Sequence, residues 1–218
     1  MFMGKISNDK NRVSDKETDR KRLFISRRTG AGEREKIIKL AVENQCDTLV
    51  FALNDSFFNT RKAKYVKLIS DYDLHVEAGG RDFPLLLPRR LFFKQRDLFR
   101  MDQGRRKPAH HFCPTNPKTT AIISGNAQIL LSHALQKVTV PRVFHLLPDE
   151  GHEKTWCACP ACRAFRPAEQ YLIAVNTAAD ILLKLDPDAK MAYIDFDIEP
   201  EAEGIKPRKN MFSTSVIR

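Results

Sequence analysis

The chain has 218 residues, of which 42% are hydrophobic and 29% are charged. This is the composition of a soluble globular protein, and no apolar run approaches the ~20 residues that cross a bilayer. Much of the formal net charge of +10 comes from scattered basic clusters such as Lys21-Arg22. These clusters lack the interleaved aromatic side chains of a single-strand nucleic-acid binder, so they favour a solvated surface.

Residues 1–20 are polar and rich in Lys, Arg, Asp and Asn, which predicts a disordered arm. Because this segment lacks the apolar stretch of a secretory signal, we expect a cytoplasmic protein. The five cysteines are an odd number and nothing in the sequence indicates secretion, so a disulfide framework is not expected.

After the arm, short apolar segments alternate with amphipathic ones. We expect strands at 23–25, 48–53, 75–78, 143–147 and 191–198, and helices at 33–44, 60–71, 119–135 and 168–185. This alternation implies parallel strands joined by right-handed crossovers. A doubly wound open sheet is the rival architecture, but no G-x-G-x-x-G follows the first strand.

We therefore predict an α/β fold with a parallel sheet over residues 21–200. About five strands and four helices make up a partial (β/α)8 TIM-type barrel, since a closed one typically needs about 250 residues. Residues 201–218 are expected to be an irregular tail. The stretch 81–117 is expected to be a long loop, and loops of that length in compact domains are usually functional.

Polar side chains gather at the predicted C-terminal ends of the strands, where parallel barrels bind their ligands. The candidate substrate-binding residues are Asn54, Glu77, Arg81, Asp82, His111, Asn116, His145, Tyr193 and Asp195. Some have a structural alternative: Asn116 suits the cap of the following helix, and Asp195 suits a solvent-facing sheet edge.

Asp149 and Glu150 follow the fourth predicted strand and are the candidate catalytic pair. Glycoside hydrolysis commonly uses two carboxyl groups, one protonated as the acid and one ionised. The alternative is that this pair caps a helix or lies in a solvated loop.

Three cysteines lie at C-x-C-x-x-C spacing: Cys157, Cys159 and Cys162. A tight turn can bring three such sulfur atoms onto one tetrahedral metal ion, and a structural zinc is the first expectation. His152, His145 and Cys113 are candidates for the fourth ligand. The alternative is that the cysteines are small apolar side chains that pack under Trp156.

Several blocks occur in a characteristic order: GGRDF at 79–83, LLLP at 85–88, FCPTNP at 112–117, PDEG at 148–151, WCACPAC at 156–162 and PAEQY at 167–171. Over roughly residues 75–195 the chain resembles the bacterial domain-of-unknown-function 4838 family (DUF4838), whose members are glycoside-hydrolase-like barrels. The resemblance implies a (β/α)8 fold and a carbohydrate substrate.

The Asp149-Glu150 pair is also similar to the pair that β-hexosaminidase-type barrels carry after their fourth strand. That resemblance implies that Glu150 is the general acid and that Asp149 orients the acetamido group of the substrate. Two features depart from the DUF4838 pattern: Gly80-Arg81 stands where the family usually has Gly-His, and family members continue well beyond the fifth strand. The chain is therefore expected to be truncated and incomplete as a catalyst.

A sheet cut at the fifth strand would expose apolar edges at 23–25 and 191–198, so self-association is expected. Three functions remain open. The chain is a glycoside-hydrolase-like protein acting on carbohydrate, a non-catalytic sugar-binding or zinc-stabilised module, or a basic nucleic-acid-binding protein.

Overall fold

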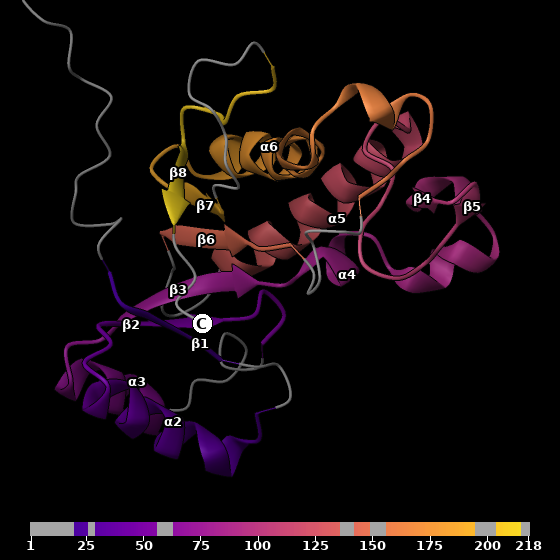
Figure 1. The fold of residues 1–218 in the computed structure, drawn as a ribbon. Coiled ribbons are helices and arrows are strands. Elements are labelled where there is room, and N and C mark those ends of the chain that lie inside the picture. Colours follow the sequence, from indigo (N-terminus) through magenta and orange to yellow (C-terminus); the bar gives the residue numbers. More distant parts are fainter. Residues whose placement is uncertain are drawn as a thin grey trace, which may run out of the picture.

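The computed structural model describes residues 20–25, 29–55, 63–135, 142–148, 156–194 and 204–214. Its main sheet contains β1 (Arg22–Ile25), β2 (Thr48–Phe51), β3 (His75–Gly80), β6 (Val143–Leu146), β7 (Lys190–Ile194) and β8 (Met211–Thr214). All neighbouring strands of this sheet are parallel and follow the order β1-β2-β3-β6-β7-β8 (Figure 1). Because the strand order never reverses, the sheet is the wall of a partial barrel and not a doubly wound sheet.

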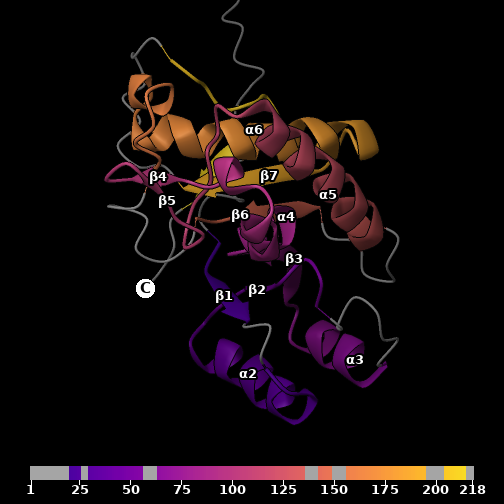
Figure 2. The same ribbon diagram turned by 90° about the vertical axis from the view of Figure 1, so that its right-hand side faces the viewer.

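Four longer helices connect these strands: α2 (Ala31–Glu43), α3 (Ala63–Asp71), α5 (Pro117–Leu135) and α6 (Pro167–Leu185). Helices α2 and α3 cover the β1–β2 side, whereas α5 and α6 cover the β6–β7 side, so the sheet curves between the two pairs (Figures 1 and 2). The predicted parallel α/β fold is confirmed, and the predicted elements lie within a few residues of the observed ones. No helix among the described residues is long and apolar enough to cross a membrane.

Two helices begin at a proline, one or two residues before the start that the sequence predicts. Pro117 is the first residue of α5, and the side-chain Oδ1 of Asn116 accepts a hydrogen bond from the Lys118 N–H at 3.0 Å. Pro167 is the first residue of α6, and the Glu169 carboxylate accepts the Arg166 N–H at 2.7 Å. These caps satisfy N–H groups that a helix start otherwise leaves without partners.

The stretch between β3 and α5, expected as a long loop, is an ordered insertion. It contains α4 (Phe83–Leu86), the 3₁₀ helices η1 (Arg89–Phe93) and η2 (Arg96–Leu98), and the antiparallel hairpin β4 (Met101–Asp102) and β5 (Arg105–Arg106). The insertion lies beyond the arrowheads of β3 and β6 in Figure 1, at the C-terminal edge of the sheet. It therefore stands at the end where barrels of this class bind ligands.

The two faces of the sheet differ in chemistry. Side chains such as Phe51, Phe144 and Met191 face the helices and belong to the main hydrophobic core. The opposite face carries Glu77 and His145, which alternate with core residues along β3 and β6. The guanidinium of Arg22 lies 5.9 Å from the ring centre of Phe212, so side chains of the two outermost strands meet inside the curve of the sheet.

The expectation of an irregular C-terminal tail is wrong for residues 211–214, which form the sixth strand β8 beside β7. A run of four residues is too short to be recognised as a strand from the sequence. Their burial depends on contact with β7 and α6. Asn210 anchors the segment because its Nδ2 donates to the Ala179 carbonyl of α6 at 3.0 Å. The expected edge at 191–198 is wrong as well, since β7 is an inner strand and the outermost strands are β1 and β8. Residues 195–200 lie outside the described residues.

The backbone of β3 approaches β6 closely at Gly79. Gly79 has a φ of +119°, and a Cβ there would overlap the His145 backbone. We expect Gly79→Ala to lower the free energy of unfolding by at least about 3 kcal/mol, because strain and overlap add. Urea denaturation would measure the change.

Gly125 provides the matched control. It lies in α5, and nothing lies within 4 Å of an added Cβ. Gly125→Ala should leave stability unchanged or raise it by up to about 1 kcal/mol through helix propensity. Equal unfolding midpoints for the two variants would contradict the close approach of β3 and β6.

Candidate functional site

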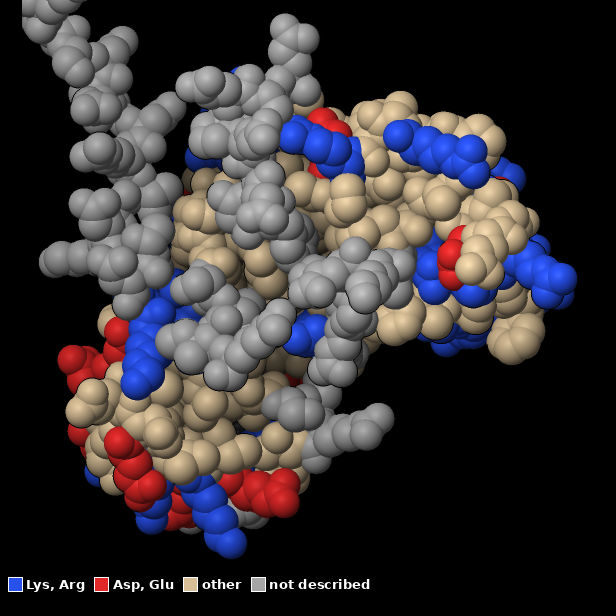
Figure 3. Space-filling model, in the orientation of Figure 1, with Lys and Arg blue, Asp and Glu red and all other residues tan. Residues whose placement is uncertain are grey.

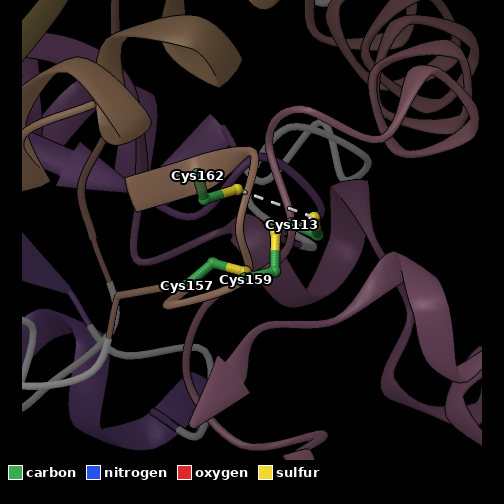
Figure 4. Close-up of side chains that lie close together, drawn as sticks. All are labelled: Cys113, Cys157, Cys159 and Cys162. Carbon is green, nitrogen blue, oxygen red and sulfur yellow. Dashed lines mark hydrogen bonds between the residues drawn. The ribbon is translucent and has the colours of Figure 1, made fainter. Parts of the chain in front are cut away.

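Four cysteine side chains converge at the C-terminal edge of the sheet. Cys113 comes from the insertion, and the other three come from the segment between β6 and α6: Cys157, Cys159 and Cys162 (Figure 4). All four side chains are buried, and their sulfur atoms lie within 4.8 Å of one another. They form a small cluster of their own, distinct from the main core.

The spacing of the sulfur atoms fits a tetrahedral metal ion. The Sγ atom of Cys113 lies 3.7 Å from Sγ of Cys159 and 3.7 Å from Sγ of Cys162. Four thiolates at a Zn–S distance of about 2.3 Å are separated by about 3.8 Å along each tetrahedron edge. A disulfide would need about 2.05 Å, and all four cysteines are free. The cluster could therefore hold one metal ion.

The sequence offers three candidates for the fourth metal ligand. Of these, Cys113 is the one whose sulfur atom lies in the cluster. His145 points into the inner face of the sheet and is bonded to Glu77. His152 lies outside the described residues. Cys113 is separated from Cys159 by 46 residues, so only the folded insertion brings it to the other three.

Several donors surround the sulfur atoms. The Met101 N–H donates to Sγ of Cys157 at 3.2 Å, and Nη1 of Arg106 lies 3.7 Å from the same sulfur. The hydroxyl of Thr115 lies 3.1 Å from Sγ of Cys162. Donors directed at sulfur stabilise thiolates, which are the form that binds metal.

The pKa of the Cys113 thiol lies well below its usual range. Hydrogen bonds from the Cys157 and Cys162 thiols contribute most, burial opposes them, and the Arg106 guanidinium contributes further. A thiolate is thus available in the cluster at neutral pH. The hydrogen bonds with Cys113 raise the pKa of Cys157 and of Cys162. Metal binding would therefore release protons from these two thiols, because a structural metal ligand must be deprotonated.

Gln170 orders the segment that carries three of these cysteines. It is buried near the start of α6, and its Oε1 accepts the Cys157 N–H at 3.0 Å. Its Nε2 lies within hydrogen-bond distance of three carbonyl oxygens, those of Cys157, Cys162 and Phe165, at 3.1 to 3.2 Å. The Gln170 side chain therefore satisfies buried backbone groups of a loop that forms no strand pairing of its own.

A second polar grouping lies on the inner face of the sheet. Nε of Arg22 donates to the Glu77 carboxylate at 2.7 Å, and Nη2 donates to its other oxygen at 3.3 Å. The His145 Nε2 lies 2.6 Å from the same carboxylate, and Phe24 packs edge-on against the imidazole at 5.3 Å. At most 3% of any of the three polar side chains is exposed. Barrel interiors usually carry bulky apolar side chains at such positions.

Burial and pairing set the charges of this grouping. Burial raises the pKa of Glu77, but the hydrogen bonds and charges of His145 and Arg22 outweigh it, and the net pKa is lowered. Burial lowers the pKa of His145 more than Glu77 raises it. At neutral pH a neutral His145 therefore donates its Nε2–H to an ionised Glu77. Its Nδ1 is then an acceptor, and it has no hydrogen-bond partner among the described residues.

The remaining predicted site residues have varied positions. Asp82 is buried and accepts the Leu53 N–H at 3.0 Å, which ties the insertion to the end of β2. Asn116 caps α5 and also bonds Asp97 at 2.9 Å, so its structural alternative is the one the contacts favour. Tyr193 belongs to the main hydrophobic core.

Asn54 and Arg81 are exposed, and Nη1 of Arg81 lies 3.5 Å from the Pro148 carbonyl. His111 is buried and stacks on Trp156. Asp149, Glu150 and Asp195 lie outside the described residues, so their assignment remains a prediction. The sequence interpretation missed Arg22, which was read as surface charge although it is buried.

No protein-family model and no curated protein matches the sequence. Among solved structures, the chain is similar to the GH20 catalytic modules of the pneumococcal exo-beta-D-N-acetylglucosaminidase StrH, with a TM-score of 0.57 and 9% identity. The match covers 90% of this chain and 59% of that one. Exo-beta-1,4-mannosidase Op5Man5 from Opitutaceae bacterium strain TAV5 has a TM-score of 0.38 and 12% identity, over 80% of this chain and 31% of that one.

At 9% identity, the likeness to StrH establishes the fold alone. It agrees with the partial barrel described above. The chain spans 59% of the length of that structure.

The buried histidine makes stability depend on pH. Below its usual pKa of 6.5, His145 takes up a proton in the unfolded chain but not in the folded one, so stability falls. The ionised Glu77 adds stability above its usual pKa of 4.5, and this is lost as pH falls through its lowered native pKa. Each excess proton bound by the unfolded chain lowers stability by at most about 1.4 kcal/mol per pH unit.

We expect the wild type to lose more stability between pH 7 and pH 5 than His145→Gln, as measured by urea denaturation at each pH. The same substitution at the exposed His133 of α5 is the control and should retain the wild-type slope. A His145→Gln variant with an unchanged pH slope would contradict the neutral buried imidazole.

Proposed function

We propose that this chain is part of a carbohydrate-binding barrel of the glycoside-hydrolase type, of the kind the DUF4838 resemblance implies. The observation that carries the proposal is the Arg22–Glu77–His145 grouping on the inner face of the sheet. Buried ions are costly to keep where apolar side chains would serve packing as well. His145 lies on a strand that ends at the edge where barrels of this class bind ligands, and its buried Nδ1 has no hydrogen-bond partner among the described residues.

The geometry alone does not select the sugar. The neighbour with the higher TM-score is named as an exo-beta-D-N-acetylglucosaminidase, and the Asp149-Glu150 pair is similar to that of β-hexosaminidase-type barrels. Both observations favour an N-acetylglucosaminide as the first ligand to try. In this proposal Glu150 is the general acid and Asp149 orients the acetamido group.

Variants of the proposed catalytic pair distinguish an enzyme from a non-catalytic binding module. We expect chitobiose, the disaccharide of N-acetylglucosamine, to bind saturably in calorimetry. Glu150→Gln should lower any hydrolysis of an aryl N-acetylglucosaminide by about 10²- to 10⁴-fold while retaining affinity, because a general acid acts on the reaction rather than on binding. Asp149→Asn should lower hydrolysis as well, because the acetamido group would no longer be oriented by a carboxylate.

Binding without hydrolysis in the wild type would leave the chain a non-catalytic sugar-binding module. No saturable binding of chitobiose would contradict the proposal. Gln128→Glu on the exposed face of α5 serves as a control for a change of one charge.

We further propose that the four-cysteine cluster is a structural zinc site. The 3.7 Å separations between Sγ atoms and the complete burial of a four-thiol set support a closed tetrahedral site with no open position for substrate. Zinc there would join the insertion to the segment before α6, two loops at the same edge of the sheet. The ion would then supply stability that these irregular segments lack.

Elemental analysis of the purified protein should find about one zinc per chain. Cys113→Ser should lose that zinc and lower the unfolding temperature, because a structural zinc contributes directly to folding free energy. Cys46 lies half-buried outside the cluster, so Cys46→Ser should retain both the metal and the stability. Full zinc content in Cys113→Ser would contradict the four-cysteine assignment.

A further inference from the structure

The insertion between β3 and α5 concentrates positive charge. Residues 81–117 contain nine Lys and Arg side chains and only three acidic ones, all of them Asp. Figure 3 shows Lys and Arg gathered over the insertion, on the right, whereas acidic and basic side chains are mixed over α2 and α3 at the lower left. The excess of positive charge is therefore a local feature of the insertion and not a property of the whole surface.

Some of these cations hold the insertion together. Nζ of Lys107 donates to the Asp102 carboxylate at 2.7 Å, and Nη1 of Arg100 lies 3.5 Å from the same carboxylate. Nη1 of Arg106 donates to the Phe99 carbonyl at 2.7 Å. These contacts within the insertion account for three of its cations, and they also use the carboxylate of Asp102.

Four other cations are exposed, and we call them the basic surface: Arg90, Lys94, Arg96 and Arg105. The side chains of Arg90, Lys94 and Arg105 form no hydrogen bond or ion pair with another residue in the described part of the chain. Like charges that gather without counter-charges repel one another, and a bound anion would relieve that repulsion. The basic surface therefore has the charge to bind an anionic ligand.

Aromatic packing fixes the backbone beneath the basic surface. The Phe92 ring of η1 packs edge-on against Phe99 at 5.5 Å, and the Arg96 guanidinium of η2 lies 5.6 Å from the centre of the Phe92 ring. Phe99 is fully buried and forms a β-bridge with Phe112. Because η1 and η2 are joined to the core in this way, a ligand would find the cations on an ordered scaffold, which lowers the entropic cost of binding.

The basic surface belongs to the insertion at the C-terminal edge of the sheet, where barrels of this class bind ligands (Figure 1). Three of its four cations are Arg, whose planar fork matches the paired oxygens of a carboxylate or a sulfate. We propose that the basic surface binds the anionic groups of an acidic oligosaccharide that carries carboxylates or sulfates. The inference rests on the proposed carbohydrate function and names the class of its ligand.

The exposed side chains favour a saccharide over two other anionic partners. A binder of single-stranded nucleic acid presents several aromatic rings on which successive bases stack. Among the large apolar side chains that are exposed in the described residues, only Phe93 belongs to the insertion. One ring also offers little apolar area for insertion into an anionic bilayer.

Calorimetry with three matched tetrasaccharides tests the inference. Chitotetraose is neutral, chitotetraose sulfated on its primary hydroxyl groups adds only sulfates, and the hyaluronan tetrasaccharide alternates N-acetylglucosamine with glucuronate. In about 0.05 M NaCl we expect at least one acidic ligand to bind about tenfold more tightly than chitotetraose. In about 0.5 M NaCl that preference should fall below about threefold, because salt screens exposed charges. The preferred acidic ligand identifies sulfate or carboxylate as the group that is bound.

A pair of double variants tests the place of binding. Arg90→Gln/Lys94→Gln should remove most of the preference for the acidic ligand and leave the affinity for chitotetraose unchanged. Lys36→Gln/Lys39→Gln removes the same charge from the exposed face of α2 and should retain the preference. An equal loss in both variants would show that the net charge of the chain, and not the basic surface, attracts the ligand, and would overturn the inference.

The outcomes separate this inference from the proposed function. Equal affinity for acidic and neutral tetrasaccharides in low salt would overturn the acidic ligand and leave the carbohydrate function standing. Binding of the acidic ligands alone would support the basic surface and contradict a neutral N-acetylglucosaminide as the ligand. No binding of any tetrasaccharide would overturn both proposals.

The two other anionic partners serve as competitors. A single-stranded oligothymidylate, or a vesicle of phosphatidylglycerol, that binds the wild type more tightly than either acidic tetrasaccharide and loses affinity in Arg90→Gln/Lys94→Gln would overturn the saccharide assignment. Weaker binding of both competitors would support it. If Arg90→Gln/Lys94→Gln fails to fold, the salt dependence and the three tetrasaccharides still decide with the wild type alone.

Discussion

The hydrogen bonds of Glu77 constrain how the strands of the sheet align with one another. Its carboxylate joins Arg22 of β1 to His145 of β6, so three of the six strands must present their polar positions to the same face. A slip of one residue in any of them would bring an unpaired charge against the helices and expose the core side chains. The ion pair therefore adds specificity of register, a role that neutral packing would not enforce in the same way.

The glycines that end β3 make this arrangement sterically possible. Gly79 pairs with His145 in the sheet, and the absence of a side chain allows the two backbones to approach closely. Successive residues of a strand point to opposite faces of the sheet. With His145 on the inner face, its neighbours Phe144 and Leu146 therefore point into the helix-facing core. The polar grouping and the hydrophobic core are thus two consequences of one register.

The repeating elements could be predicted from sequence, but contacts between distant residues could not. Hydrophobic periodicity located the helices and five strands, because each carries its own apolar face. The strand β8 was missed because Met211 and Phe212, on opposite faces of the sheet, become buried only when β7 lies beside them. Arg22 was interpreted as surface charge because its partner Glu77 is 55 residues away. Cys113 was one of three candidates, and the folded insertion alone distinguishes it from the histidines.

The cysteine cluster contacts the β4–β5 hairpin of the insertion. The β4–β5 hairpin has two residues in each strand, and a hairpin of that length is not stable alone. Met101 and Arg106 of this hairpin both contact Sγ of Cys157, so the sulfur cluster joins the hairpin to the segment before α6. A metal ion bound by the four cysteines would add a further link between the insertion and that segment. The same contacts bring His111 and Trp156 together, so the cluster also determines which aromatic rings meet at the C-terminal edge of the sheet.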